Sequence, residues 1–286
     1  MTNSPEIEKI VDPRKRVIMV IGASDSGKTT LVWSIARSLK ERFRTAIVDL
    51  DMGQSRIGPP TTIGWAMMAP DIEDWAELNV RDFYFTGTVT PLGNLLPAIT
   101  GARLMTERAL NSAEKVIIDT TGLISEPAGP VLKHHKIDIL RPDIILAVEL
   151  SNELSHILDP LRFNRKPDIV RVPVPPGIRI KTQPRRGEYR FERMINYLKG
   201  AEEISLDKDR IGIRYTRTPL RFKSEFLNRI ISLRNRSNQD IAIGVIKGLT
   251  EKDIKVLTPL RDANEVSSLI IGRTVIGIEN RTLKDF

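Results

Sequence analysis

The sequence predicts an α/β protein with a parallel β-sheet, followed by a small β-rich module. Along the first two-thirds of the chain, short apolar runs alternate with segments of helical periodicity, which is the pattern of a parallel α/β sheet. A glycine-rich segment, GASDSGKT (22–29), stands between the first apolar run and the first helical segment. After about residue 201 the pattern changes to β-like runs separated by glycines.

Each predicted element is defined by its hydrophobic pattern. Continuous apolar runs such as RVIMVIG and KVIIDT are typical of strands that are buried on both faces. The predicted strands are 16–22, 45–50, 82–85, 115–120, 143–150 and 169–174. The predicted helices, in which apolar residues recur at helical spacing, are 28–43, 92–110, 131–140, 153–163 and about 188–199.

The chain is predicted to divide near residue 200. Residues 173–187, VPVPPGIRIKTQPRR, are rich in proline, glycine and basic residues, which predicts a mobile connection before the last helix. Gly200 follows that helix and is a usual helix terminator. The later β-like runs are 242–249, 253–260 and 268–279. We therefore expect one domain in residues 1–200 and a β-rich domain in residues 201–286.

The composition excludes several classes of protein. The 286 residues contain no cysteine, which excludes disulfides, zinc fingers and thiol catalysis. The chain has no run of 18 apolar residues, so no membrane span is expected. The N-terminal segment MTNSPEIEKIVDPRKRV lacks the apolar core of a secretion signal. We therefore expect a cytoplasmic protein that does not associate with membranes.

The positive charge of the chain is unevenly distributed. The formal net charge is +8, and residues 161–199 alone carry 11 basic and three acidic residues. A basic segment beside a nucleotide site indicates a polyanionic second substrate. A solvated basic surface would give the same composition, so charge alone leaves both interpretations open.

The segment 22–29 matches the phosphate-binding motif GxxxxGK(S/T) at every fixed position. It lies between a predicted strand and a predicted helix, as this motif requires. Its backbone N–H groups are expected to surround the β-phosphate, Lys28 to reach the β- and γ-phosphates, and Thr29 to bind Mg²⁺. The predicted nucleotide-binding residues of the loop are Gly22, Ala23, Ser24, Asp25, Ser26, Gly27, Lys28, Thr29 and Thr30.

Acidic residues follow two of the predicted strands. Asp49 and Asp51 lie in DLDMGQS, and Asp119 ends the strand KVIIDT. Ligands bind outside the carboxyl ends of parallel strands, so these carboxylates are candidates for holding Mg²⁺ or for accepting a proton from an attacking hydroxyl. Capping of a turn by Asp49 is the alternative. The sequence does not divide the metal and base roles among the three residues.

Together these segments resemble the polynucleotide 5′-hydroxyl kinases, whose eukaryotic members act in mRNA 3′-end cleavage, tRNA splicing and ribosomal RNA processing. Archaeal members of that family are shorter. The order of motifs matches: GASDSGKTT, DLDMGQS, TTIGW, YFTGTVTPLGN, DTTG and an arginine-rich segment. The resemblance covers roughly residues 16–200, and DLDMGQS and TGTVTP are its most specific segments.

The resemblance implies roles for individual residues. It makes Asp51 the general base on the 5′-hydroxyl of RNA or DNA, with ATP or GTP as the phosphate donor and Mg²⁺ as the metal. Thr29, Asp51 and Asp119 are the candidate metal residues. Gln54 and Thr121 are assigned to the acceptor side. The segment 86–90 corresponds to a clasp over the phosphates, in which Thr90 is the expected contact.

The arginine-rich segment at about 176–199 corresponds to a lid that closes over the triphosphate. Arg186, Arg190 and Arg193 align with lid arginines, and their spacing places them on one helix face. Arg190 and Arg193 are expected to act in catalysis with Lys28, and Arg186 to bind the nucleotide. Guanidinium groups stabilise the charge of a transferring phosphoryl group. An amphipathic helix with a solvated basic face is the alternative.

The chain departs from the family pattern at two points. The position after DTTG is often an aromatic residue that stacks on the acceptor base, but here it is Leu123. The separate N-terminal β domain of the eukaryotic members has almost no room before Arg16. Trp65 and Trp75 are candidates for lining an acceptor channel, although core packing is the favoured interpretation. The three histidines show no metal-ligand spacing.

Two other functions compete with the kinase. A regulatory GTPase usually carries an (N/T)KxD motif, and the nearest match, RKPD (165–168), lacks the Asn or Thr. An ATP-bound scaffold of an RNA-processing complex, without turnover, would not need Lys28, Thr29 and Asp51. The resemblance also implies RNA-processing proteins as possible partners.

Overall fold

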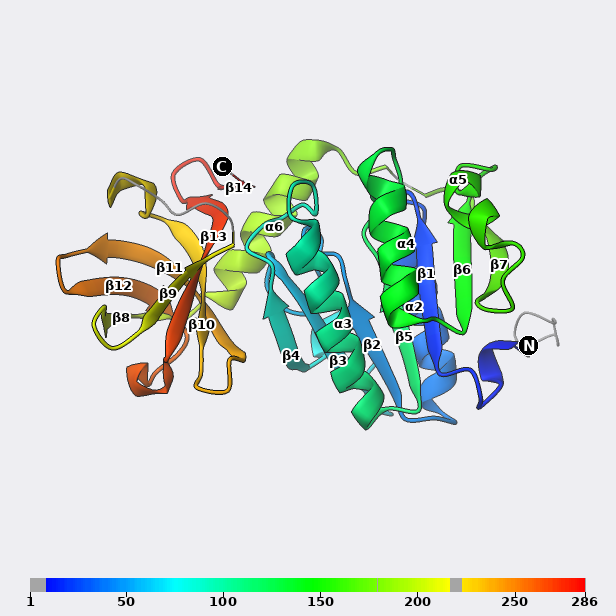
Figure 1. Ribbon diagram of the computed structural model, residues 1–286, viewed down its shortest axis with the longest axis horizontal. Helices are drawn as coiled ribbons and strands as arrows, with labels where there is room; N and C mark the ends of the chain where they lie inside the picture. Colours follow the sequence, from blue (N-terminus) through cyan, green and yellow to red (C-terminus); the bar gives the residue numbers. More distant parts are fainter. Residues whose placement is uncertain (1–8, 179, 217–222, 286) are drawn as a thin grey trace.

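Two β-sheets lie side by side with helix α6 (Gln183–Tyr197) between them (Figure 1). The computed structural model describes residues 9–178, 180–216 and 223–285. Residues 1–8 and residue 179, which lies inside the predicted lid segment, are therefore outside the described residues. No helix in the described part of the chain is long and apolar enough to cross a membrane.

The first sheet has seven strands in the order β4-β3-β2-β5-β1-β6-β7. Its strands are β1 (Val17–Gly22), β2 (Thr45–Asp49), β3 (Thr62–Met68), β4 (Val80–Phe85), β5 (Lys115–Asp119), β6 (Ile144–Glu149) and β7 (Asp168–Pro173). The five strands from β2 to β7 are parallel, as predicted. The pairs β2–β3 and β3–β4 are antiparallel, so the sheet is parallel over five strands and mixed at this edge.

Helices cover both faces of the first sheet. They are α2 (Lys28–Lys40), α3 (Leu95–Ser112), α4 (Ala128–Leu140), α5 (Ser155–Leu158) and the 3-10 turns η1 (Trp75–Glu77) and η2 (Asp159–Leu161). Side chains of β1 alternate between the faces: Met19 packs with α3 and α4, whereas Ile18 and Val20 pack with α2. This packing fixes the strand ends that carry the candidate site.

Helix α6 begins five residues earlier than predicted, at Gln183 and not near residue 188. Pro184 lies in its first turn, where proline is tolerated because its missing N–H would have no helical partner. The proline content of 173–187 therefore marks the start of a helix as well as a connection. The predicted helix 153–163 is shorter in the structure, where α5 and η2 together span 155–161.

The second sheet contains the three predicted β-runs as β11, β12 and β13. Its strands are β8 (Glu202–Asp207), β9 (Gly212–Tyr215), β10 (Arg229–Arg234), β11 (Asp240–Leu249), β12 (Asp253–Thr258), β13 (Ser268–Gly277) and β14 (Thr282–Asp285), with 3-10 turns η3 (Lys223–Glu225) and η4 (Ala263–Glu265). The order is β14-β13-β10-β11-β12-β8, with β9 added parallel to β13. The β-rich character of this region is confirmed.

A buried polar contact joins the two sheets. Asp240 at the start of β11 pairs with Arg234 at 2.7 Å, and their side chains are 2% and 4% exposed. The same carboxylate accepts a hydrogen bond from the backbone N–H of Phe85 at 3.0 Å, at the end of β4 in the first sheet. Phe85 itself packs in a cluster with Phe191 and Met194 of α6 and with Ile243 of the second sheet.

We predict that Asp240→Ala lowers the free energy of unfolding by about 3–5 kcal/mol, because it leaves a buried guanidinium unpaired. Chemical denaturation monitored by far-UV circular dichroism measures this change. Glu203→Ala is the matched control, because it removes an exposed ion pair with Lys255 in the same sheet and should cost about 0–1 kcal/mol. Equal effects of the two substitutions would contradict the interpretation that the buried Asp240 carboxylate holds the two sheets together.

Candidate nucleotide and acceptor site

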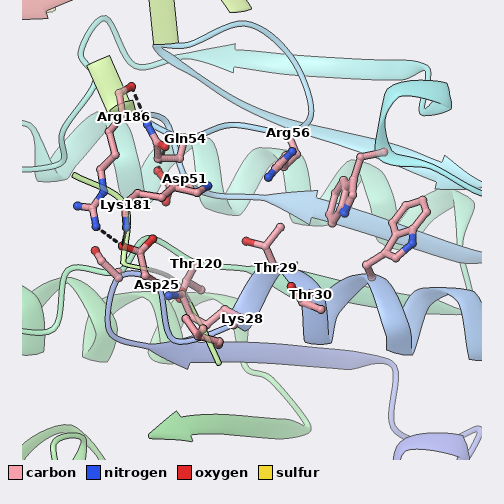
Figure 2. A pocket seen from close by; sticks show the side chains of 16 residues that line it. Asp25, Lys28, Thr29, Thr30, Asp51, Gln54, Arg56, Thr120, Lys181 and Arg186 are labelled. Atoms are coloured by element: carbon pink, nitrogen blue, oxygen red, sulfur yellow. Dashed lines mark hydrogen bonds and ion pairs between the residues drawn. The ribbon is translucent and has the colours of Figure 1, made fainter. Parts of the chain in front are cut away.

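A cavity of about 480 Å³ opens at the carboxyl ends of the parallel strands. It is bounded by the loop after β1, the loop after β2, the end of β5 and the segment that leads into α6 (Figure 2). The residues that line it are Ser24, Asp25, Gly27, Lys28, Thr29, Thr30, Trp33, Asp51, Gln54, Arg56, Trp75, Thr120, Gly122, Ile178, Lys181 and Arg186.

The glycine-rich loop forms the floor of this cavity and ends in the first turn of α2. Gly27 precedes the helix with φ 92°, a left-handed conformation that glycine adopts without strain. Lys28 folds back so that its Nζ donates to the carbonyl oxygen of Ala23 at 2.5 Å. Burial lowers the pKa of Lys28, and Ser26 Oγ is buried without a partner. These groups are arranged to receive phosphate oxygens.

Thr29 and Asp119 form the candidate metal pair. The Thr29 hydroxyl donates to Asp119 Oδ2 at 2.6 Å, across 90 positions of sequence. Asp119 Oδ1 is buried with no partner, and burial raises the pKa of this carboxyl. Mg²⁺ is bound by one or two protein oxygens together with phosphates and water. The donor set therefore fits Mg²⁺, although the described residues contain no cluster of three acidic or histidine ligands.

Asp49 and Asp51 have different surroundings. Asp49 is 2% exposed; its Oδ2 accepts from Arg56 N at 2.6 Å and from Ser55 Oγ at 3.1 Å, and its Oδ1 accepts from Asp51 N at 2.9 Å. Burial, with the charges of Asp119 and Asp51 nearby, raises the pKa of Asp49 to about 7. This geometry favours the alternative in which Asp49 organises the turn.

The Asp51 carboxylate lines the cavity instead. Its Oδ1 accepts from the backbone N–H groups of Gly53 at 3.1 Å and Gln54 at 2.9 Å. Figure 2 shows Asp51 in the same cleft as Lys28 and Thr29. Asp51 is therefore held rigidly, and it faces the space in which an acceptor would meet the donor.

Helix α6 and the segment before it cover the cavity. Arg186 pairs with Asp25 of the glycine-rich loop at 2.6 Å, and its carbonyl oxygen accepts from Gln54 Nε2 at 3.2 Å. The backbone N–H of Lys181 also donates to Asp25, at 2.9 Å. The predicted lid segment thus contacts two loops at once: the glycine-rich loop, which we call the donor loop, and the loop after β2, residues 50–61, which we call the acceptor loop.

The two other lid arginines lie deeper. Arg193 donates to the carbonyl oxygens of Arg56 at 3.1 Å and Gly58 at 2.9 Å, so it anchors the helix to the acceptor loop. Arg190 is half-buried, burial lowers its pKa, and the charges of Asp285 and Asp51 act on it. Neither residue lines the cavity.

The structure brings most of the predicted site residues to the cavity. Those that line it are Ser24, Asp25, Gly27, Lys28, Thr29, Thr30, Asp51, Gln54 and Arg186. Asp119 does not line the cavity itself but accepts a hydrogen bond from Thr29, which does. Thr121 is buried between two lining residues in the sequence, Thr120 and Gly122. Gly22, Ala23 and Ser26 belong to the loop but are not among the lining residues.

The segment 86–90 is held between the acceptor loop and the second sheet. A side chain at Gly53 would collide with the carbonyl of Val89, and Arg273 N donates to the carbonyl of Gly87 at 2.7 Å. Thr90 Oγ1 accepts from Leu92 N at 3.3 Å and does not line the cavity. The contact of this segment with the loop after β2 is therefore made by Val89, the neighbour of Thr90.

Two lysines of α4, Lys133 and Lys136, are buried, which was not predicted from the sequence. Lys133 Nζ donates to Thr120 Oγ1 at 2.9 Å and to the carbonyl of Thr121 at 2.6 Å, so it fixes the DTTG turn. Lys136 is also fully buried, but its Nζ has no hydrogen-bond partner. The available signal was the position of both lysines on the apolar side of a predicted helix. An amphipathic helix normally buries apolar residues on that side, so two lysines there are unusual.

Several comparisons identify proteins similar to this chain. Residues 22–200 match the family model described as mRNA cleavage and polyadenylation factor CLP1 P-loop. That match spans more than half of the chain. The chain belongs to the CLP1 P-loop family.

Archaeal relatives with curated names include a polyribonucleotide 5′-hydroxyl-kinase of Methanocaldococcus jannaschii, which is 38% identical over 65% of this chain but over only 51% of its own length. The chain spans about half of that relative. A polyribonucleotide 5′-hydroxyl-kinase of Pyrococcus abyssi is 29% identical over 93% of this chain and 90% of its own length.

Among solved structures, the wild-type Clp1p–Pcf11p complex matches with a TM-score of 0.71 at 15% identity, covering 93% of this chain and 76% of that one. A second Clp1p–Pcf11p structure, of a point mutant that has lost ATP, gives a TM-score of 0.74 at 16% identity. At this identity the likeness establishes the fold alone.

The unpaired ammonium of Lys136 predicts a pH effect on stability. Burial lowers the pKa of Lys136 from 10.5 to about 8. Between these values the unfolded chain binds the proton and the folded chain does not, so this residue makes stability rise with pH from about 8 to 10.5. We expect the free energy of unfolding of the native chain, relative to Lys136→Met, to increase across this window.

Denaturation curves at pH 7.5, 9 and 10.5 measure the difference. Lys133→Met is the contrasting variant, because its ammonium has two acceptors that the substitution would leave unsatisfied. It should destabilise the protein by about 1–3 kcal/mol. A constant difference between the native chain and Lys136→Met at all three pH values would contradict the assignment.

Proposed function

We propose that this protein is an NTP-dependent polynucleotide 5′-hydroxyl kinase that transfers the γ-phosphate of ATP or GTP to the 5′-hydroxyl of RNA or DNA. One observation carries the proposal. The carboxylate of Asp51 shares a single cavity with Lys28 and with Thr29 of the metal pair. The curated archaeal relatives are named polyribonucleotide 5′-hydroxyl-kinases, which supports the kinase activity of the proposal.

On the donor side, the glycine-rich loop binds the triphosphate. Its N–H groups and the N-terminus of α2 neutralise the β-phosphate. Lys28 would leave the Ala23 carbonyl to contact the β- and γ-phosphates. Thr29 and Asp119 would hold Mg²⁺, which neutralises charge on the phosphate oxygens when it is bound.

On the acceptor side, Asp51 accepts the proton of the 5′-hydroxyl as its oxygen attacks phosphorus. The hydrogen bonds from Gly53 and Gln54 keep the carboxylate aimed at the cavity. Arg186 bridges the donor and acceptor loops, so we propose that it and Arg190 stabilise charge on the moving phosphoryl group. Arg193 would act by positioning the acceptor loop.

Two observations favour this function over its alternatives. In the RKPD segment, Asp168 pairs with Lys15, Lys166 pairs with Asp143 at 2.7 Å, and none of the four residues lines the cavity. This arrangement is unlike a guanine-binding motif. A scaffold without turnover would not require a held carboxylate opposite the phosphate loop.

The proposal extends to the organisation of the chain. We propose that residues 1–200 form the kinase domain and that residues 201–286 form a β-rich domain that supports segment 86–90. RNA-processing proteins are the partners we propose, because the similar solved structures are complexes of Clp1p with Pcf11p.

We expect Asp51→Asn to lower kcat by roughly 10²–10⁴-fold, the usual contribution of a positioned general base. Nucleotide affinity should change little, because the carboxylate faces the acceptor. The assay is transfer of labelled phosphate from γ-labelled ATP or GTP to a 5′-hydroxyl RNA, with nucleotide affinity from calorimetry. Asp138→Asn, at an exposed position of α4, is the matched control.

Lys28→Ala should abolish transfer and leave the folded structure intact, because its ammonium contacts only the phosphate loop. Circular dichroism and the same transfer assay measure the two properties. Label released as free phosphate at the same rate with and without RNA would instead indicate an NTPase. Label that stays on the nucleotide in every assay would favour the scaffold.

A further inference from the structure

Two tryptophans form a tilted pair of rings in contact at the wall of the cavity. Trp33 comes from the second turn of α2 and Trp75 from η1, which follows β3. Their ring centroids are 4.9 Å apart with an interplanar angle of 31°. Trp75 was expected to pack in the core, but both rings are half-buried and line the cavity. Trp65 is buried, as predicted.

The pair is held in place by its surroundings. On their inner side both rings pack against the core cluster between α2 and the sheet. Lys40 of α2 donates to the carbonyl oxygens of Pro70 at 2.8 Å and Ile72 at 2.7 Å, which fixes the loop that carries Trp75. Asp74 and Glu77 form a reciprocal cap around η1. The exposed ring surface is therefore presented rigidly toward the cavity.

Helix geometry places the pair on the metal side of the phosphate loop. Trp33 lies four residues after Thr29, and residues at this spacing share one face of a helix. The Thr29 hydroxyl points to Asp119 on β5. Trp33 therefore stands one turn behind the threonine of the metal pair, facing the same side.

The direction of phosphoryl transfer assigns this side to the acceptor. Attacking and leaving oxygens lie roughly in line through phosphorus, so the acceptor approaches from the side opposite the β-phosphate. The β-phosphate site follows β1, and the sheet continues from β1 through β5 and β2 to β3. Asp51 follows β2, and Trp75 lies in the connection between β3 and β4, so both belong to the side of the sheet that is away from β6 and β7.

Arg56 adds a cation beside the pair. It lines the same cavity, and its guanidinium lies 5.4 Å from the ring centroid of Tyr189. Asp49 accepts from its backbone N–H and Arg193 donates to its carbonyl, so its backbone is fixed. In the part of the chain that the structure describes, no carboxylate is paired with its guanidinium. The head group is available for a phosphate.

We propose that Trp33 and Trp75 bind a nucleobase near the 5′ end of the acceptor strand by stacking, and that Arg56 binds an adjacent backbone phosphate. This inference rests on the proposed kinase function. The proposal also explains how a base can be stacked although Leu123 stands where the family often has an aromatic residue. Leu123 packs against the core cluster and does not line the cavity, so the tryptophan pair would take over the stacking. Because every base has an aromatic face, the site accepts any sequence.

The first test is kinetic. Trp33→Ala and Trp75→Ala should each raise KM for a 5′-hydroxyl decamer by roughly 5- to 150-fold, the range found for one base stacked on an aromatic side chain. The kcat at saturating decamer and the KM for ATP or GTP should be unchanged. Trp33→Phe and Trp75→Phe should restore most of the affinity. Phe163→Ala, an exposed aromatic outside this cavity, is the control and should change nothing.

The second test changes the substrate and leaves the protein native. A set of decamers is prepared, each with one abasic nucleotide at a different position near the 5′ end. For one of them, the KM with the native protein should be as high as the KM of the intact decamer with Trp33→Ala. That decamer and the substitution together should cost no more than either alone. Arg56→Gln should reduce the log–log dependence of decamer affinity on salt by about 0.7, the value for one single-strand phosphate contact.

The outcomes separate the possible occupants. A higher KM for ATP or GTP, with the decamer KM unchanged, would assign the pair to the donor base and overturn the proposal. Unchanged KM values for both substrates, with native Tm, would leave the pair a packing element and also overturn it. If an alanine variant fails to fold, the abasic decamers still decide.

A binding test separates this proposal from the kinase function. Decamer should quench the tryptophan fluorescence of the native chain, and the Trp33→Phe/Trp75→Phe double variant should lose that response. Quenching without phosphate transfer would refute the kinase and keep the base site. Transfer without quenching, and without sensitivity to an abasic nucleotide, would do the reverse.

Discussion

The buried carboxylate of Asp49 is the constraint on which the site depends. It gathers the backbone N–H groups of Asp51 and Arg56 and the Ser55 hydroxyl around two oxygens. A carboxylate removed from water needs such donors. By accepting hydrogen bonds from them, Asp49 fixes the conformation of the turn that follows β2. Three features of the cavity are attached to this turn: Asp51 projects from it, Arg193 of α6 donates to the carbonyl oxygens of Arg56 and Gly58, and Val89 packs against Gly53.

Charge balance explains why lysines are buried behind the site. Asp49, Asp51 and Asp119 are close enough that their charges raise the pKa of Asp49. Lys133 and Lys136 lie below them in α4, and the same carboxylates favour their charged forms against the cost of burial. A phosphate group in the cavity would add negative charge, and Lys28 and Arg186 line the same cavity. The fold thus places two amines beneath the carboxylates, and burial lowers the pKa of both.

Local chemistry and the meeting of parallel strand ends were predictable from the sequence, but contacts between other distant segments were not. The phosphate loop needs consecutive residues between a strand and a helix, so GASDSGKT was sufficient to predict it. The Thr29–Asp119 contact followed from the rule that parallel strand ends meet at one edge. Strand β3 escaped detection because TIGWAMM contains glycine and methionines and lacks a β-branched run. The Trp33–Trp75 pair joins segments 42 positions apart, a contact that no periodicity encodes.

The second sheet fixes the orientation of helix α6. Phe191 and Met194 of α6 pack in the cluster that joins the sheets, and Tyr197 accepts a hydrogen bond from the backbone of Ile243 in β11 at 2.9 Å. These contacts lie in the second half of the helix, whereas Arg186 near its start reaches Asp25 of the phosphate loop. The second half of α6 is thus fixed by apolar packing against the second sheet, whereas its start is joined to the two loops at the cavity by polar contacts: the Arg186–Asp25 ion pair and the hydrogen bonds of Gln54 with Arg186 and of Lys181 with Asp25. The β-rich part of the chain therefore contributes to the site through the anchored end of α6, although none of its described residues lies in the cavity wall.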